Sequence, residues 1–323
     1  MNKGESMKRA LPLLLLVAAC DREPQPITGL LTTDRATRFT EWSEPVSLGP
    51  AINSEFNDQQ AALSKDGLTL YFASNRPGTP GAGPNNDIWV ARRECLECAF
   101  GEPANLGAPV NTPGNDAAPA LSRDEHWLFI LTDRPGGLGS ADIWAAYREN
   151  VNDDFGWQPP VNLGAGVNGS GFDGGAAYFE NEGGGAQLFF NKSPLPTAGG
   201  GDIYVSTKNA DGSWGTAVAV DELNTLLTDQ RPSISHNGLD IYFFSNRDGG
   251  EGGVDIWGAT REDVSASFET PTNLGGGINT AAAEQHPFIY RKGGVEQLYF
   301  SRNLGSATVL NLDLFVSTRV RQR

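Results

Sequence analysis

Five acidic residues recur along the chain at nearly equal spacing and are the side chains best placed to do chemistry. Successive acids are 58, 57, 56 and 55 residues apart, and each comes shortly after an Asn. They are Asp58, Asp116, Asp173, Asp229 and Glu284. Carboxylates gathered around one axis would repel each other by about 2 kcal/mol per pair at ~8 Å and an effective dielectric constant of ~20. They would then need a counter-charge, such as a metal ion or a basic peptide, or a raised pKa on one of them.

Two interpretations of these acids stay open. In the simpler one, each carboxylate accepts backbone N–H bonds from the adjoining loop and recurs because the unit recurs. In the other, the acids form a ring at the mouth of a channel that binds a ligand or partner, with His286 as a further contact. Such a ring could hold a cation, and no other cofactor is expected. Catalysis is the least favoured role, because glycoside hydrolysis needs carboxylates in unequal roles and these are equivalent.

Three arginines precede an aspartate in their own units. The pairs are Arg76 with Asp87, Arg134 with Asp142 and Arg247 with Asp255. We expect each Arg to form an ion pair with an Asp within its blade or between blades and to order the loop, rather than to bind an anion. Asp202 occupies the same place without an Arg, so the aspartate does not depend on the pairing alone.

The acids belong to a repeat that supplies the elements around them. Each unit has an aromatic residue, Leu-Gly and Asn, then the acid, a short strand, a tight turn such as Ser64-Lys65-Asp66-Gly67, and an apolar strand. Each unit ends on a strand that begins Asp-Ile-Trp or a variant of it. The trailing aromatics of these strands should pack between units, and they are Trp89, Trp144, Tyr204, Trp257 and Phe315. Five units of four antiparallel strands predict an all-β, five-bladed β-propeller.

The two ends of the repeat region predict how the ring closes. The last unit ends after its Asp-Leu-Phe strand, near Thr318, and lacks an outer strand. A spare segment of the outer-strand type, Trp42–Leu48, stands at the other end of the repeats. We expect this segment to complete the fifth blade, so that the propeller comprises residues 42–323.

The first 41 residues are predicted to lie outside the propeller. Lys8 and Arg9 precede an apolar run that ends at Ala19 and is too short to span a bilayer, so residues 1–19 are typical of a secretory signal. Val17-Ala18-Ala19-Cys20 resembles the bacterial lipobox, which implies a lipid on Cys20 and residues 20–41 as a flexible tether. We therefore expect a lipid-anchored protein of the cell envelope, on its periplasmic or surface side.

Cys95 and Cys98 then remain as an even pair in an exported protein, which predicts a disulfide. A redox C-x-x-C motif usually opens a helix in a βαβ unit, and none is predicted here. The net charge of −15 argues against binding to nucleic acid and favours a monomer whose copies repel each other.

Ser74-Asn75-Arg76 followed by Asp87-Ile88-Trp89, and Ser245-Asn246-Arg247 followed by Asp255-Ile256-Trp257, resemble the WD40-like (PD40) repeats of the TolB propeller family. The resemblance covers roughly residues 42–320 and implies the fold. Because the five acids are equivalent, we favour a non-catalytic propeller that presents one face to an envelope protein or a glycan. The alternative is a glycan-active hydrolase of the five-bladed type, with channel carboxylates in unequal roles.

Overall fold

The computed structural model describes residues 39–78, 85–181, 185–194, 200–306 and 309–322. The predicted signal peptide, Cys20 and the tether up to residue 38 lie outside these ranges. The compact unit begins at Phe39, three residues before the predicted boundary. Phe39 bridges Arg321, and the guanidinium of Arg319 lies 4.8 Å from the centroid of its ring.

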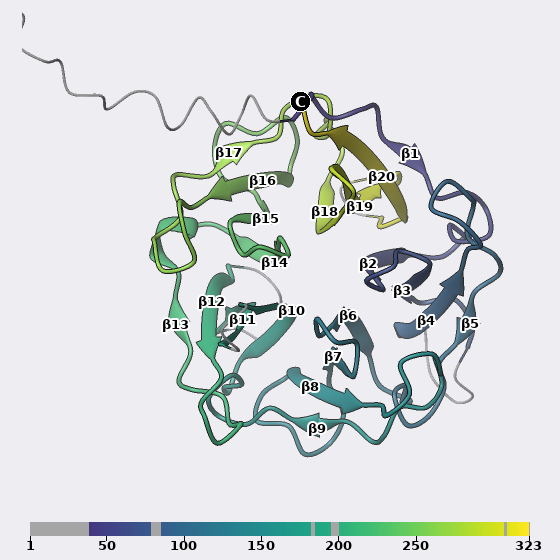
Figure 1. Cartoon of the computed structure of the whole chain (residues 1–323), viewed down its shortest axis with the longest axis vertical. Coiled ribbons are helices and arrows are strands. Elements are labelled where there is room, and N and C mark those ends of the chain that lie inside the picture. The colour runs from purple at the N-terminus through teal and green to yellow at the C-terminus, as the bar shows by residue number, and fades with distance from the viewer. Residues whose placement is uncertain (1–38, 79–84, 182–184, 195–199, 307–308, 323) are drawn as a thin grey trace, which may run out of the picture. The chain divides into compact units, whose positions relative to one another are not determined.

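Five four-stranded antiparallel sheets form a closed ring, which confirms the five-bladed β-propeller (Figure 1). The first blade contains β2 (Asp58–Leu63), β3 (Thr69–Ser74), β4 (Asp87–Arg92) and β5 (Ala104–Asn105). The second contains β6 (Asp116–Leu121), β7 (Trp127–Thr132), β8 (Asp142–Tyr147) and β9 (Val161–Asn162). The third contains β10 (Phe172–Glu180), β11 (Ala186–Ser193), β12 (Asp202–Thr207) and β13 (Val218–Ala219). The fourth contains β14 (Asp229–Ile234), β15 (Asp240–Ser245), β16 (Asp255–Thr260) and β17 (Thr272–Asn273). The fifth contains β18 (Glu284–Lys292), β19 (Val295–Asn303), β20 (Leu312–Val320) and, from the other end of the unit, β1 (Val46–Ser47).

The ring closes through β1, as the spare outer-strand segment predicted. Val46 pairs with Val316 and Ser47 with Phe315, so β1 is the outer strand beside β20. No helix in the described part of the chain is long and apolar enough to cross a membrane. The helix η1 (Asp221–Leu223) is a single 3-10 turn.

Apolar side chains fill the spaces between neighbouring blades. Leu70 and Phe72 of the first blade, for example, share one buried cluster with Tyr299 and Leu314 of the fifth. The predicted role of the trailing aromatics is confirmed, because each lies in or against such a cluster. Burying a side chain of this size contributes roughly 1.5–3 kcal/mol, so the interfaces between blades hold the ring together.

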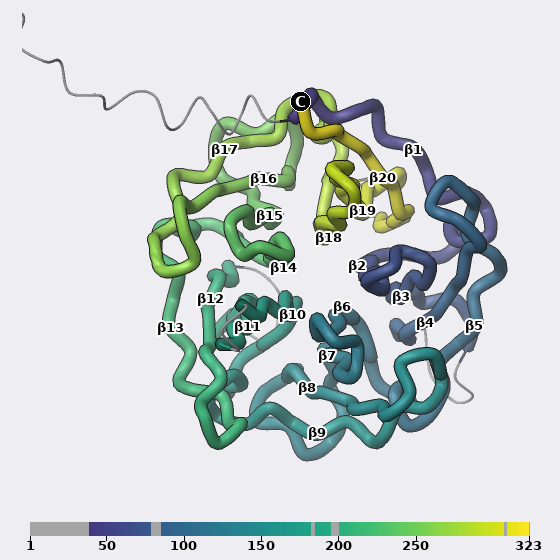
Figure 2. Tube along the Cα trace, viewed as in Figure 1, coloured from purple at the N-terminus to yellow at the C-terminus, as the bar shows by residue number. Residues whose placement is uncertain are grey.

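The inner strand of every blade is interrupted two residues after its acid. The pairing with the second strand shifts there in all five blades, and the residue at the shift has a positive φ between 52° and 66°. We call these five residues the bulge ring: Gln60, Ala118, Gly175, Arg231 and His286. Figure 2 shows the inner strands β2, β6, β10, β14 and β18 around the central axis. A non-glycine residue in the left-handed region costs roughly 1–3 kcal/mol, so the fold holds four of these positions under strain.

Candidate functional site

The five predicted acids are buried where the inner strands begin, and each caps the loop before it. Asp58 is 0% exposed, and its Oδ2 accepts hydrogen bonds from the backbone N of Ser54 at 2.6 Å and from its Oγ at 2.8 Å. The other four acids each accept a bond from the residue four positions earlier, namely Thr112, Gly169, Thr225 and Thr280. The structure thus gives these carboxylates the loop-capping geometry, and their role in ligand binding stays a prediction.

Each acid also forms an ion pair with a cation that lies 18 or 19 residues further along the chain. The pairs are Asp58–Arg76, Asp116–Arg134, Asp173–Lys192, Asp229–Arg247 and Glu284–Arg302. The expected pairing of Arg76, Arg134 and Arg247 with an aspartate is therefore confirmed within each blade, and the partner is the acid that begins the inner strand rather than Asp87, Asp142 or Asp255. Asp58 and Asp87 both lie opposite Ser74, one on each neighbouring strand, and Arg76 reaches back two residues to Asp58.

The cation of each pair makes a second contact that fixes it in the fold. Lys192 Nζ donates to the carbonyl of Val167 at 2.6 Å, and Arg302 Nη2 donates to that of Ile278 at 2.9 Å. The three arginines of the other blades donate to the equivalent carbonyls of Ile52, Val110 and Leu223. We call each acid with its cation a clamp. No group of three His, Cys, Asp or Glu that could hold a metal ion occurs in the described ranges.

The aspartates that begin the third strands are not equivalent. Asn105, Asn162 and Asn273 donate to Asp87, Asp142 and Asp255 at 2.7–2.9 Å. Asp202 and Asp313 have no corresponding hydrogen bond in the described part of the chain. Burial and the neighbouring carboxylate of Asp229 raise the pKa of Asp202, and burial and Asp58 raise the pKa of Asp313. The propeller therefore does contain carboxylates in unequal settings.

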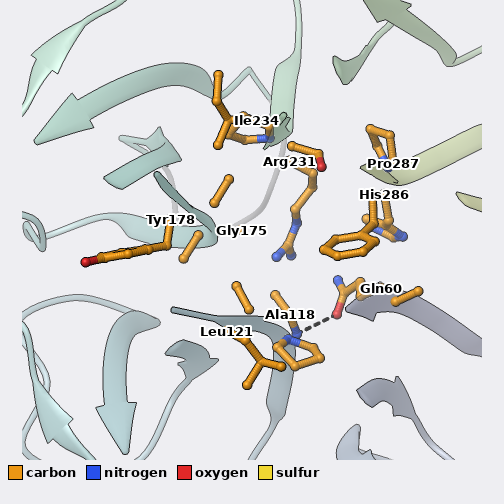
Figure 3. A pocket seen from close by; sticks show the side chains of 17 residues that line it. Gln60, Ala118, Leu121, Gly175, Tyr178, Arg231, Ile234, His286 and Pro287 are labelled. Atoms are coloured by element: carbon orange, nitrogen blue, oxygen red, sulfur yellow. Dashed lines mark hydrogen bonds between the residues drawn. The ribbon is translucent and has the colours of Figure 1, made fainter. Parts of the chain in front are cut away.

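The bulge ring lines a cavity of about 90 Å³ in the central channel (Figure 3). His286, predicted at the channel mouth, is buried there, and its Nδ1 lies 3.3 Å from Ser301 Oγ. Burial and the charge of Arg231 hold the pKa of His286 well below its usual value. Gly175 leaves space for Arg231, since a Cβ at residue 175 would come within 2.5 Å of Arg231 Cδ.

A second and larger hollow lies between the second and third blades. This cleft of about 780 Å³ is lined by Trp127, Trp214 and Tyr178, together with the carboxylates of Asp124 and Glu180. The Tyr178 hydroxyl donates to Glu180 Oε2 at 3.2 Å. Lys208, which also lines the cleft, has its Nζ 6.0 Å and 5.9 Å from the ring centroids of Trp127 and Trp214. None of these residues was among the predicted site residues. The one signal is Trp127, a large aromatic side chain that is exposed while the rest of its strand is buried.

The carboxylate of Asp124 has a strongly polar setting at the rim of this cleft. It accepts hydrogen bonds from Ser122 Oγ at 2.5 Å and from the backbone N of His126 at 3.2 Å. Burial raises the pKa of Asp124, but these bonds outweigh it and hold the pKa below its usual value. Burial and the nearby carboxylates of Glu180 and Asp124 raise the pKa of Tyr178, so its phenol stays protonated at neutral pH.

Cys95 and Cys98 form a disulfide, with their Cα atoms 5.0 Å apart. The bond closes the connection between β4 and β5 at the edge of the first blade. It lies in a strand-to-strand turn without an adjoining helix, which is the setting expected of a structural clip.

Comparison with known proteins shows likeness in structure alone. No protein-family model matches the chain, and no curated protein matches it in sequence. The catalytic domain of the GH62 α-L-arabinofuranosidase of Coprinopsis cinerea matches at 13% identity, with 88% of this chain and 98% of that one covered and a TM-score of 0.59. An α-L-arabinofuranosidase of Lactobacillus brevis matches at 11% identity over 84% of this chain and 92% of its own, with a TM-score of 0.55. A glycoside hydrolase matches at 10% identity, 89% and 94% coverage and a TM-score of 0.61.

These matches contradict the resemblance to the TolB propellers, because the structures named are glycoside hydrolases and no family model supports WD40-like repeats. The Ser-Asn-Arg and Asp-Ile-Trp segments instead stabilise the blade itself. Arg76 of the first segment forms an ion pair with Asp58, and Asp87 of the second accepts a hydrogen bond from Asn105. The preference for a non-catalytic scaffold without enzymatic activity is contradicted by the same structures. The preference rested on the equivalence of the five acids. Because all five acids form ion pairs in clamps, their equivalence says nothing about carboxylates elsewhere in the fold.

Proposed function

We propose that this chain is a glycan-active hydrolase of the five-bladed propeller type. The observation that carries the proposal is the match of the complete ring, along nearly the full length of both chains, to arabinofuranosidases. A fold alone does not set an activity, so the proposal also needs a site in this chain that suits a sugar.

The cleft between the second and third blades is that site. Its volume of about 780 Å³ falls in the range of roughly 300–1,000 Å³ that is usual for small-molecule sites. Sugar rings have apolar faces that stack on aromatic side chains, and Trp127, Trp214 and Tyr178 line the cleft. Their polar neighbours, Lys208 and the two carboxylates, can bind the hydroxyl groups at the ring edges.

Asp124 and Glu180 supply the carboxylates that glycoside hydrolysis requires, one to protonate the leaving oxygen and one to act on the sugar or on water. Asp124 is held ionised by its hydrogen bonds and so takes the role of base or nucleophile. Glu180, the other carboxylate that lines the cleft, is then left for the role of proton donor.

The test compares hydrolysis by the wild type with that of Asp124→Asn, Glu180→Gln, Trp127→Ala and Trp214→Ala on aryl α-L-arabinofuranosides, aryl β-xylosides and arabinoxylan. The carboxylate variants should lose kcat by ~100-fold or more, and the tryptophan variants should mainly raise KM. Asp66→Asn is the matched control, because Asp66 accepts the same turn hydrogen bond from Ser64 in the first blade, at 2.6 Å. If kcat falls equally in Asp66→Asn and Asp124→Asn, Asp124 only stabilises its turn and takes no part in catalysis.

We further propose that the enzyme works in the cell envelope, anchored by a lipid on Cys20. The lipobox-like sequence at Val17–Cys20 supports this location. Labelling of cells with a radioactive fatty acid tests it: wild type should carry the label and Cys20→Ala should not.

A further inference from the structure

We propose that the central channel binds a compact anion, either a carboxylate or an inorganic oxyanion, through Arg231, His286 and Gln60. This site shares Tyr178 with the cleft assigned to glycans, but the three residues that carry it do not line that cleft, and it does not depend on the hydrolase proposal.

Arg231 forms no ion pair with any carboxylate in the described ranges of the chain. Every clamp cation has a carboxylate within 2.8 Å, and the buried Arg148 lies 3.5 Å from Asp154. Among the described residues that line the cavity, none is Asp or Glu. The Nη1 atom of Arg231 is buried without a hydrogen-bond partner in the described part of the chain. Burial lowers the pKa of this guanidinium to about 10, which still leaves it charged at neutral pH.

The amide of Gln60 is oriented to donate into the same cavity. Its Oε1 accepts the backbone N–H of Ala118 at 2.7 Å, which fixes the oxygen on that side. The NH2 group is therefore on the opposite side, and in Figure 3 it faces the guanidinium of Arg231. A side-chain amide fixed in this way offers hydrogen-bond donors and no acceptor to the channel.

The imidazole of His286 also lines the cavity. Ser301 Oγ accepts the backbone N–H of Gln60 at 3.3 Å, which leaves its own hydroxyl proton for His286 Nδ1, also at 3.3 Å. The imidazole is neutral at pH 7, because burial and Arg231 disfavour its charged form. With Nδ1 accepting from Ser301, the single proton would be on Nε2 and would add a third donor. Three donors and one positive charge in a cavity without carboxylates match an anion and repel a cation.

The backbone indicates that the fold is adapted to this arrangement. Gln60, Arg231 and His286 all keep a positive φ that L-residues rarely adopt, and such strain is concentrated at functional positions. The two other members of the bulge ring, Ala118 and Gly175, are small and leave room. The cavity of about 90 Å³ is several times the ~30 Å³ that one water molecule occupies in the liquid, which suits acetate or phosphate.

The experiment is thermal unfolding of the purified chain in gluconate, an anion too large for the cavity, with added acetate, phosphate or chloride at constant ionic strength. We expect acetate or phosphate to raise the Tm of the wild type saturably, by roughly 5 °C at an anion concentration ~100 times the Kd. Arg231→Met should have a higher Tm than the wild type in gluconate, because an unpaired charge is removed, and should lose the response to both anions.

Arg231→Lys keeps a positive charge and should retain a weaker response, which separates binding from folding. Arg76→Met is the matched control: it breaks a clamp, so it should lower Tm in every buffer while leaving the anion-induced rise intact. An equal anion response in wild type and Arg231→Met would overturn the proposal. A response to chloride alone would overturn the assignment to a carboxylate or oxyanion. A lower Tm for Arg231→Met in gluconate would show that Arg231 is already neutralised.

Discussion

Lys192 Nζ lies 2.6 Å from Asp173 Oδ1, and it reaches the acid from the position directly opposite in the sheet. In the first blade, Arg76 forms the same clamp from two residues beyond that position. The cation of a clamp can therefore come from either of two positions on the second strand and still reach the acid. The third blade therefore keeps its clamp although its sequence lacks the Arg of the repeat.

The clamps should contribute strongly to stability. Arg134→Met leaves the fully buried Asp116 without its cation, and breaking a buried pair by removing one partner typically costs 3–5 kcal/mol. We expect a loss of about that size in the free energy of unfolding, measured with urea. The double variant Asp116→Asn/Arg134→Met should lose clearly less than the sum of the two single variants, and strict additivity would contradict the clamp.

The third-strand aspartates should respond to substitution with opposite signs. Asp202→Asn should raise the free energy of unfolding at pH 7, because it removes a charge that burial and Asp229 disfavour. The folded-state pKa is above the unfolded value of 3.8, so this gain should vanish below about pH 3.8, where both states are protonated. Asp142→Asn, at the equivalent capped position, should lower stability at pH 7. Losses in both variants would show that Asp202 is also satisfied.

His286 should make stability depend on pH. Its folded-state pKa lies well below 6.5, so the unfolded chain binds an extra proton as the pH falls below that value. The contribution of His286 to stability is therefore lost on acidification, with a slope approaching about 1.4 kcal/mol per pH unit. Denaturation between pH 7 and pH 5 should show a smaller slope for His286→Asn than for wild type. His236→Asn, at an exposed position whose pKa is also lowered, should remove a smaller part.

Gly175 and Arg231 should be energetically coupled. Gly175→Ala would place a Cβ 2.5 Å from Arg231 Cδ, at a φ of +66°, and should cost roughly 1–3 kcal/mol. In an Arg231→Ala background the contact with Cδ is gone, while the backbone strain and the 2.8 Å approach to Asn191 Oδ1 remain, so the cost should be smaller. A double-mutant cycle from urea denaturation measures this difference, and a coupling energy of zero would contradict the packing of Arg231 against Gly175.

The sequence predicted the fold because each structural device recurs with every unit. The repeat of acid, turn and Asp-Ile-Trp indicated five blades, and the spare segment at Trp42–Leu48 indicated how they close. The spacing did not reveal which aspartate pairs with Arg76, because Asp58 and Asp87 both lie opposite Ser74, one on each neighbouring strand.

The two hollows were harder to foresee. At the bulge ring the backbone conformation recurs while the residue type changes from Gln to Ala, Gly, Arg and His, so no repeat marks it. Trp127 and Trp214 belong to different blades and meet only once the ring has formed. Only His286 of the residues now assigned to a ligand was among the predicted site residues, and its surroundings are the channel rather than the acids.

The release of reducing sugar from arabinoxylan by purified wild type, Asp124→Asn, Glu180→Gln and Asp66→Asn tests the proposed hydrolase most directly. We predict hydrolysis by wild type and Asp66→Asn, and a loss of ~100-fold or more in the two cleft variants, with all four proteins folded by circular dichroism. No release by wild type from arabinoxylan or from the aryl glycosides would contradict the hydrolase, and full activity in the two cleft variants would contradict its assigned site.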